Sequence, residues 1–363
     1  VYNFSRDKLD GNVTTLISEY KANLGKKSAG ELNYDEKKIS WTSSLISKVL
    51  KNEPVVNEHV FALSYYRPFV KLLSYRGSAL IHRIGQLKQL FPTSEYENLV
   101  ICVSGIGVTK DFSCIVTNVL PDLELIGKSQ CFPLYWYEEE TSTFETGGMD
   151  NLFGNSYVRH DGVTDWILAA ARKLYGDSVA KDDLFYYVYG LLHSPEYRTA
   201  FANDLKKSLP RLPLLEKPDD FWAFVGAGRE LAALHLNYEN IEPYRGCTVT
   251  YGAYSNRGGE SINYRVEKMR FGKTDGKTVD KSTIHYNGGI TITGIPAEAY
   301  EYVINGKSAI EWIMERYAIT IDKKSGIIND PNDWPREHGD EKYILNLLLR
   351  IVTLSLKTTA IVK

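Results

Sequence analysis

The sequence predicts a protein of the α+β class, in which mixed, mostly antiparallel sheets pack with helices. Runs rich in β-branched and aromatic residues come in blocks and do not alternate strictly with helical runs, which disfavours a doubly wound parallel sheet. The 363 residues, 43% hydrophobic and 24% charged, have the composition of an ordinary globular protein. A chain of this length can bury a large core in one domain or several.

The first 57 residues are expected to form a helical segment ahead of a main domain that covers residues 58–363. Amphipathic spacing behind a cap at Asn12 predicts a helix over residues 13–21, and Trp41 anchors a second helix over residues 40–51. The chain begins with Val1 and its first residues resemble the interior of a domain, so we expect a longer parent polypeptide.

A β-rich part is expected from residue 58 to residue 140, interrupted by one helix near residues 79–90. Its β-branched and aromatic runs predict strands at residues 61–66, 98–103, 114–119 and 131–137. Residues 141–162 are polar and rich in glycine, which indicates a long surface loop.

The second half is expected to be helical at 163–240, β-rich at 246–296 and helical again at 297–356. The break at Ser194-Pro195 is a helix start, with serine as the cap and proline in the first turn. Helical periodicity predicts helices at 163–175, 181–208 in two parts, 219–238, 297–317 and 341–355. Glycine-rich turns are expected at residues 256–259, 274–277 and 287–289.

Catalytic motifs match this chain poorly. Gly105-Ile-Gly107 follows a strand but lacks the third glycine of a dinucleotide or methyl-donor loop, so a simple turn is favoured. Asp330-Pro-Asn-Asp-Trp334 lacks the second proline of an adenine methyltransferase loop. Glu19-Tyr-Lys21, with Asp10 upstream, is the nearest match to a Mg²⁺ nuclease site, yet it fits better as a solvated helical face.

Histidine and cysteine patterns also favour structure over chemistry. His193 and Ser194 are adjacent in sequence and so do not form a dyad, and His235 is expected to be a hydrogen-bonded core histidine. The cysteines are scattered without a CxxC pair, so a zinc ribbon is not expected. Few cysteines, no signal peptide and no apolar run judged long enough for a bilayer predict a cytoplasmic protein with no membrane partner.

The composition favours a binding surface. The 25 tyrosines suit either an interface or a sheet-rich core. With 43 Lys+Arg against 45 Asp+Glu the formal charge is −2, so a site for nucleic acid must be a local basic face. Basic residues near 206–211 either clamp phosphates or end a solvated helix. We expect DNA contacts from Arg67, Lys71, Arg198, Lys206, Lys207, Arg211, Arg257, Lys268, Arg270, Lys273, Lys277, Asn305 and Lys307.

Several strings, in order along the chain from about residue 60, resemble the C-terminal specificity region of type ISP restriction–modification enzymes. These strings are Tyr66-Arg-Pro-Phe69, Gln130-Cys-Phe-Pro-Leu-Tyr135, Tyr187-Val-Tyr-Gly-Leu-Leu-His-Ser-Pro-Glu-Tyr-Arg198, Leu209-Pro-Arg-Leu-Pro213, Gly228-Arg-Glu-Leu231, Leu234-His-Leu-Asn-Tyr-Glu239, Gly294-Ile-Pro296, Tyr302-Val-Ile-Asn-Gly-Lys-Ser-Ala-Ile-Glu-Trp312 and Ser325-Gly-Ile-Ile-Asn-Asp-Pro-Asn332.

The resemblance implies a fold like that of a target-recognition domain and a non-catalytic role. This domain would read duplex DNA beside the upstream methyltransferase and the helicase and nuclease domains of one polypeptide. Residues 1–57 would then be the tail of that methyltransferase. The parent would use S-adenosylmethionine, ATP and Mg²⁺, whereas no cofactor is expected here. Base readout is expected from the segments 141–162 and 251–281, because specificity resides where members differ.

Two alternatives remain open from the sequence. The chain could be an enzyme, a diverged stand-alone methyltransferase or nuclease, which tight S-adenosylmethionine binding or Mg²⁺-dependent cleavage would reveal. It could instead be a protein-docking platform within the parent enzyme, which binding to the other domains without DNA affinity would reveal.

Overall fold

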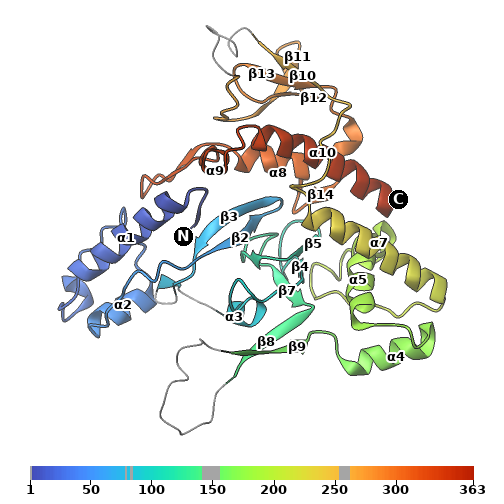
Figure 1. Cartoon of the computed structure of the whole chain (residues 1–363), viewed down its shortest axis with the longest axis horizontal. Coiled ribbons are helices and arrows are strands. Elements are labelled where there is room, and N and C mark those ends of the chain that lie inside the picture. Colours follow the sequence, from blue (N-terminus) through green and yellow to red (C-terminus); the bar gives the residue numbers. More distant parts are fainter. Residues whose placement is uncertain (1, 78–79, 82–84, 141–155, 253–261) are drawn as a thin grey trace. The chain divides into compact units, whose positions relative to one another are not determined.

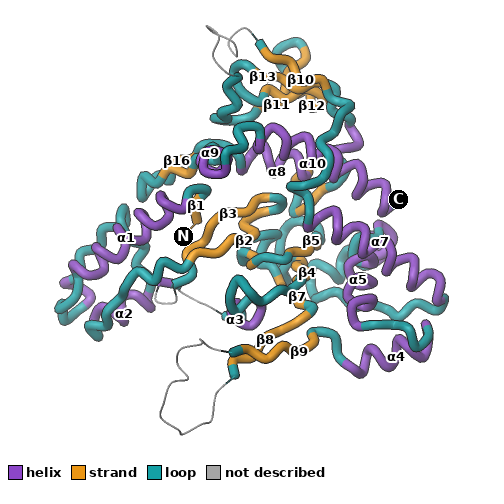
Figure 2. Tube along the Cα trace, viewed as in Figure 1, coloured by secondary structure: helices purple, strands orange, loops and turns teal. Residues whose placement is uncertain are grey.

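The computed structural model describes residues 2–77, 80–81, 85–140, 156–252 and 262–363. The chain divides into two compact units. Figure 1 colours the residues by their position along the sequence. Unit 1 contains residues 1–84, 238–303 and 307–359, and unit 2 contains residues 85–237, 304–306 and 360–363. Helices and several small sheets with antiparallel pairings make up the fold (Figure 2), which confirms the predicted α+β class.

The N-terminal helices belong to the same core as the first sheet of unit 1. Helix α1 (Arg6–Ala22) begins earlier than predicted because Ser5, not Asn12, caps it by accepting a hydrogen bond from Lys8 N. Helix α2 (Ser43–Leu50) is capped by Thr42. Apolar side chains of both helices pack with Tyr75 of strand β3. Residues 1–57 therefore share a core with residues beyond 57, although the sequence suggested a segment of their own.

The described part of unit 1 includes two larger sheets. In the first, β3 (Val70–Tyr75) lies between β1 (Tyr2–Asn3) and β2 (Phe61–Arg67). The second has four strands in the order β10-β13-β12-β11. Their bounds are β10 (Thr248–Tyr251), β11 (Arg270–Thr274), β12 (Thr278–His285) and β13 (Ile290–Thr293). This second sheet is the predicted β-rich part of the second half, and it carries the candidate site described below.

The helix predicted over residues 297–317 is wrong in its first half. A 3₁₀ turn η6 (Ala297–Tyr300) is followed by a turn at Asn305 and Gly306, whose φ angles are 48° and 79°. A left-handed backbone cannot continue a helix, so helix α8 (Ala309–Arg316) starts only after Ser308 caps it. The short strands here are β14 (Val303–Ile304), β15 (Lys307–Ser308), β16 (Thr320–Ile321) and β17 (Ile328–Asn329).

Two helices close unit 1. Helix α9 (Asp333–His338) was not predicted, and helix α10 (Tyr343–Val362) is longer than the predicted 341–355. By length and composition alone α10 could cross a membrane, which corrects the expectation that no apolar run is long enough. Just over half of its most apolar window, 56%, is buried inside the protein, as in the core helix of a folded domain.

Unit 2 combines a three-stranded sheet, a hairpin and helices. The sheet has the order β5-β4-β7. Strand β8, which overlaps the predicted strand 131–137, pairs with β9, which lies within the predicted loop 141–162. The strands of unit 2 are β4 (Val100–Val103), β5 (Cys114–Thr117), β6 (Leu120–Pro121), β7 (Gln130–Pro133), β8 (Tyr135–Glu139) and β9 (Tyr157–Asp161). Its helices are α3 (Leu87–Leu90), α4 (Asp165–Tyr175), α5 (Lys181–Leu191), α6 (Pro195–Ala200) and α7 (Pro218–Leu236).

A glycine pair lets α5 and α7 approach each other closely. A Cβ added to Gly228 would lie 1.9 Å from Tyr186 O, and one added to Gly190 would lie 2.3 Å from Phe224 O. Only glycine fits at both positions, because real Cβ atoms do not approach a carbonyl oxygen so closely. Both glycines fall in strings that carry the family resemblance, so at least this part of the resemblance is scaffold.

Candidate nucleic-acid interface

Several predicted contact residues are engaged inside their own unit. The ammonium of Lys71, whose side chain is 14% exposed, pairs with Glu239 at 2.6 Å. Arg198 Nε donates to Leu192 O at 2.6 Å, and its guanidinium lies over the ring of Phe112. Because these cations already have internal partners, we no longer expect Lys71 or Arg198 to contact phosphate.

Four further candidates are also held locally. Lys206 pairs with Asp111 at 3.1 Å, and Lys307 pairs with Glu315 and lies over the ring of Trp312. The guanidinium of Arg67 stacks on Tyr66 and donates to its carbonyl oxygen. Asn305 lies in the left-handed turn, where its N–H donates to Ser113 Oγ at 2.8 Å. A structural role explains each of these residues without DNA.

The remaining described candidates are exposed cations with no recorded ion pair. In the described part of unit 2 these are Lys207 and Arg211. In unit 1 they are Lys268, Arg270, Lys273 and Lys277, and no ion pair or side-chain hydrogen bond is recorded for any of the four within the described residues. Arg257 and the turn at 256–259 lie outside the described residues, as does most of the segment 141–162. Unpaired exposed cations are what a phosphate backbone attracts.

The four unit 1 cations lie on or beside a β-hairpin at the edge of the second sheet. Strands β11 and β12 are joined through Asp275 and Gly276, whose φ angles of 51° and 70° give the predicted tight turn. Lys273 and Lys277 lie near this turn, and Arg270 lies at the open end opposite His285. Residues 262–285 contain six basic and three acidic residues, whereas the whole chain has a net charge of −2. This is the local basic surface that the composition required.

A cleft of about 780 Å³ opens at the base of this hairpin. Its volume lies within the range of ordinary ligand sites, but its lining is polar instead of apolar. The lining residues are Asn263, Arg265, Glu267, Lys268, Arg270, His285, Asn287, Gly288, Gly289 and Thr291. Lys268 and Arg270 were predicted as contact residues, and Asn263, Arg265 and Glu267 fall in the segment 251–281 from which base readout was expected. The lining residues from His285 onward were not predicted.

One face of the sheet presents a polar row that crosses all four strands. Arg270 opposes His285, His285 opposes Thr291, and Thr291 opposes Thr250. Directly opposed residues of antiparallel strands point to the same face. The adjacent row, Phe271, Ile284, Ile292 and Val249, points to the opposite face, where Ile284 and Ile292 are fully buried. The alternation Thr-x-Thr at 248–250 and 291–293 was the sequence signal for this polar face.

A hydrogen-bond network fixes the main chain that lines the cleft. Asn332 Nδ2 donates to Val266 O at 2.7 Å, and Asn332 Oδ1 accepts from Val266 N at 2.8 Å. Asn287 Nδ2 donates to the carbonyl oxygens of Asn263 and Arg265, each at 3.0 Å. Residues 263–266 are thereby held from two sides.

Asp330 completes this network by pairing with Arg265 at 2.8 Å. Burial raises the pKa of Asp330, but the hydrogen bonds from Asn332 and the Arg265 guanidinium outweigh it, so the net pKa is below its usual range. The ion pair neutralises Arg265, which leaves Lys268 and Arg270 as the uncompensated cations of the lining. The segment Asp330-Pro-Asn332 is therefore a clamp on the cleft.

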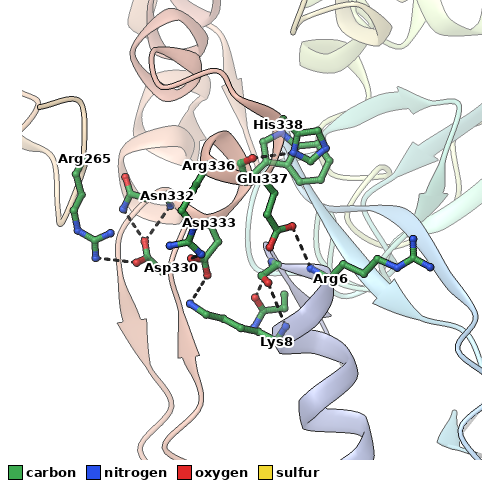
Figure 3. Close-up of polar contacts among 12 residues, drawn as sticks. Arg6, Lys8, Arg265, Asp330, Asn332, Asp333, Arg336, Glu337 and His338 are labelled. Carbon is green, nitrogen blue, oxygen red and sulfur yellow. Dashed lines mark hydrogen bonds and ion pairs between the residues drawn. The ribbon is translucent and has the colours of Figure 1, made fainter. Parts of the chain in front are cut away.

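Beside it, the carboxylate of Asp333 is fully buried and accepts from Lys8 at 2.5 Å and Arg336 at 2.7 Å. This pairing joins helix α9 to the first turn of α1 (Figure 3). A buried carboxylate with two cations is satisfied, so we assign it a structural role.

The rejected catalytic motifs have structural explanations. In the Gly105–Gly107 turn, Gly105 N donates to Gly127 O at 3.0 Å and Gly107 N to Lys206 O at 3.2 Å, so these amides are not free for phosphate. Glu19 is buried and pairs with Lys38 at 3.2 Å, which corrects its expected place on a solvated face. The described residues contain no group of three or more His, Cys, Asp or Glu placed to hold a metal.

Buried polar residues of unit 2 fit the core interpretation as well. Tyr189 Oη lies 2.6 Å from Nδ1 of His235, which confirms His235 as a hydrogen-bonded core histidine. Ser194 Oγ accepts from Tyr197 N at 3.1 Å, which confirms Ser194 as a helix cap.

Comparisons with known proteins give one consistent family. The family model of the Type ISP C-terminal specificity domain matches residues 1–347, including the first 57 residues that the sequence analysis assigned to an upstream domain. No curated protein matches the chain.

Solved structures agree. The chain is similar to the structure described as "ATP-dependent Type ISP restriction-modification enzyme LlaBIII bound to DNA", with 37% identity and a TM-score of 0.85, over 99% of this chain and 22% of that one. A nuclease-deletion mutant of the Type ISP restriction-modification enzyme LlaGI, in complex with a DNA substrate mimic, gives 36% identity and a TM-score of 0.81, over 100% of this chain and 31% of that one.

A DrdV–DNA complex gives 30% identity and a TM-score of 0.82, over 100% of this chain and 34% of that one. This chain thus spans between about a fifth and a third of the length of these proteins. The resemblance found in the sequence is confirmed along the chain, and the protein belongs to the family of Type ISP C-terminal specificity domains.

Proposed function

We propose that this chain is the DNA target-recognition part of a restriction–modification enzyme and that the β11–β12 hairpin with its cleft is the contact surface. The observation that carries this proposal is the difference between two sets of cations. Lys71, Arg198, Lys206 and Lys307 have partners, whereas Lys268, Arg270, Lys273 and Lys277 are exposed without a recorded one in the described residues. Phosphate contacts from such residues set register, and neighbouring polar groups read bases.

The relatives support this role, because the three solved structures are described as bound to DNA or to a DNA substrate mimic. By analogy, the parent polypeptide is an ATP-dependent restriction–modification enzyme that acts in the cytoplasm. It uses S-adenosylmethionine, ATP and Mg²⁺ in its other domains, and this part is non-catalytic and needs no cofactor.

The proposal is tested by measuring binding to a pool of random duplexes. Fluorescence anisotropy reports the affinity at several salt concentrations. We expect the affinity to fall steeply with salt, because each neutralised phosphate contributes a slope of about −0.9 in log K against log salt. Sequencing of the bound fraction should enrich one short motif. Absence of affinity at low salt, for this chain and for a polypeptide that also contains the methyltransferase part, would contradict the proposal.

A second function, docking to the rest of the parent polypeptide, is favoured by an apolar cleft in unit 2. The cleft has a volume of about 320 Å³, and α4 contributes Ile167 to its lining. On the same helix Trp166 is 78% exposed, which is unusual for so large an apolar side chain. The solved relatives are three to five times longer than this chain, so a segment of the same polypeptide is the proposed occupant.

Binding of the separately produced remainder of the parent, measured by calorimetry, tests this second function. Trp166→Ser should weaken that association at least several-fold without changing stability, because the indole is already solvated. Equal binding by Trp166→Ser and by the unsubstituted chain would count against docking at this cleft.

A further inference from the structure

We infer that Arg270 reads a guanine in the major groove, and that the row Arg270–His285–Thr291–Thr250, whose first three residues line the cleft, is the base-reading face of the sheet. The inference rests on the proposed DNA-binding function and adds a residue and a base to it. It starts from the cross-strand register, which places these four side chains in one line on one face of the sheet.

The chemistry of the row suits base edges better than phosphates. Two threonine hydroxyls and an imidazole follow a single guanidinium, so three of the four groups are uncharged donors and acceptors when the histidine is neutral. The lining also includes the exposed carboxylate of Glu267, which repels phosphate but can accept from the exocyclic amine of cytosine. A surface built for phosphate alone would not place a carboxylate there.

The length of the row fits a short target. Neighbouring strands lie about 4.8 Å apart, so four strands place the ends of the row about 14 Å from each other. Laid along a groove, that distance faces about four base pairs at about 3.4 Å each.

Guanine follows from the donor pattern of Arg270. A guanidinium presents a planar fork of donors and no acceptor, and guanine alone offers two adjacent acceptors, O6 and N7, in the major groove. No ion pair or hydrogen bond that would occupy the Arg270 side chain is recorded among the described residues. His285, which it opposes, has Nδ1 at 3.2 Å from Thr291 Oγ1, so the imidazole is oriented within the row.

The face is also held in place, as a reader of bases must be. The buried side of the sheet carries Ile284, Ile290, Ile292 and Tyr286. Tyr286, the residue after strand β12, donates its Oη–H to Tyr264 O at 2.9 Å, which ties the segment before Lys268 to the end of that strand. The polar row therefore stands on a packed apolar layer and does not depend on a loop.

The test compares Arg270→Lys with the unsubstituted chain. Lys21→Ala, which removes an exposed charge from helix α1, is the control. Random-duplex selection defines the motif, and each guanine in it is then replaced in turn by 7-deazaguanine, which lacks the N7 acceptor. For the unsubstituted chain we expect one guanine whose replacement lowers the affinity about 5- to 50-fold. Arg270→Lys should lose that sensitivity while its salt dependence stays the same, because its charge is kept. Lys21→Ala should keep the full sensitivity.

The outcomes separate the inference from the proposed function. Suppose that the unsubstituted chain binds duplexes and selects a motif, and that Arg270→Lys selects the same motif with the same sensitivity to 7-deazaguanine. DNA recognition then stands, and the inference that Arg270 reads guanine is wrong. Selection of a motif without guanine, or binding without any motif, also overturns the inference. If neither the chain nor the longer polypeptide binds DNA, both fail together.

Discussion

Asn332 holds the main chain of Val266 by two hydrogen bonds, donating to its carbonyl oxygen at 2.7 Å and accepting from its N–H at 2.8 Å. An amide side chain supplies one donor and one acceptor in this way, and so replaces the pairing that a neighbouring strand would give. Val266 is fully buried, and the residues that flank it, Arg265 and Glu267, line the cleft. Asn332 is thus a positioning residue for the proposed DNA surface.

Asn332→Ala should therefore lower both stability and discrimination. It leaves the buried N–H and carbonyl of Val266 without their partner, which costs about 1–3 kcal/mol in the free energy of unfolding. The salt dependence of DNA binding should not change, since no cation is lost. Urea denaturation and competition between the selected motif and a scrambled duplex measure the two effects.

A matched change controls for the loss of an amide side chain. Asn237→Ala removes an exposed amide whose side chain, within the described residues, donates to Ala233 O at the end of α7. It should leave motif discrimination as it is. Discrimination that is as good in Asn332→Ala as in Asn237→Ala would mean that the clamp has no role in recognition.

Glu267→Gln should raise affinity for unrelated duplexes while weakening the preference for the selected motif. The carboxylate lines the cleft, where it repels the phosphate backbone, and exposed charges interact by about 0.2–1 kcal/mol, or up to about fivefold in affinity. The amide also gains a donor that can pair with adenine. Anisotropy with matched and scrambled duplexes would check this, and a gain confined to the selected motif would contradict it.

The sequence was sufficient for the class of fold and for the family, but the internal pairing of individual basic residues could not be read from it. Composition required a local basic face, and residues 268–277 supply it. Lys71 looked equally suitable, because its partner Glu239 is 168 residues away and that pairing cannot be read from a linear pattern. The same limit hid Asp330 and Asn332, whose partners lie 65 and 66 residues upstream.

The difference between Lys277 and Lys71 gives a direct test of that sorting. Lys277→Ala should lower the magnitude of the salt slope by about 0.9, because one phosphate contact is lost, and should leave stability within about 0.5 kcal/mol. Lys71→Met should leave the slope unchanged but reduce stability, because the half-buried Glu239 keeps its hydrogen bond from Tyr343 but loses its cationic partner. The opposite pattern, with the slope reduced only in Lys71→Met, would refute the assignment.

Helix α7 offers a comparison between two glycines that sequence alone cannot tell apart. A Cβ added to Gly226 would have nothing within 4 Å, whereas one added to Gly228 would lie 1.9 Å from Tyr186 O. Gly226→Ala should stabilise the protein by about 0.5–1 kcal/mol through helix propensity. Gly228→Ala should destabilise it by about 2–4 kcal/mol, because α5 and α7 must move apart. Thermal denaturation of both variants decides the matter, and a stabilised Gly228→Ala would show that the crossing is looser than described.

The buried histidines of unit 2 predict a loss of stability in mild acid. Burial lowers the pKa of His235 to about 3, and burial together with the charge of Arg198 holds the pKa of His193 well below its usual range. Unfolded histidine has a pKa near 6.5, so the unfolded chain binds protons that the folded chain excludes. The stability is fully present above about pH 6.5 and falls as the pH decreases toward 3.

Between pH 7.5 and pH 5.5 the free energy of unfolding should drop by about 1.4 kcal/mol for each histidine. A double variant, His193→Gln with His235→Gln, keeps an amide for hydrogen bonding but does not titrate, so its drop over the same range should be smaller by about 3 kcal/mol. Urea denaturation at both pH values measures the difference. An equal drop in the free energy of unfolding for the unsubstituted chain and the double variant would mean that other groups take up the protons. These two histidines would then not be the source of the acid sensitivity.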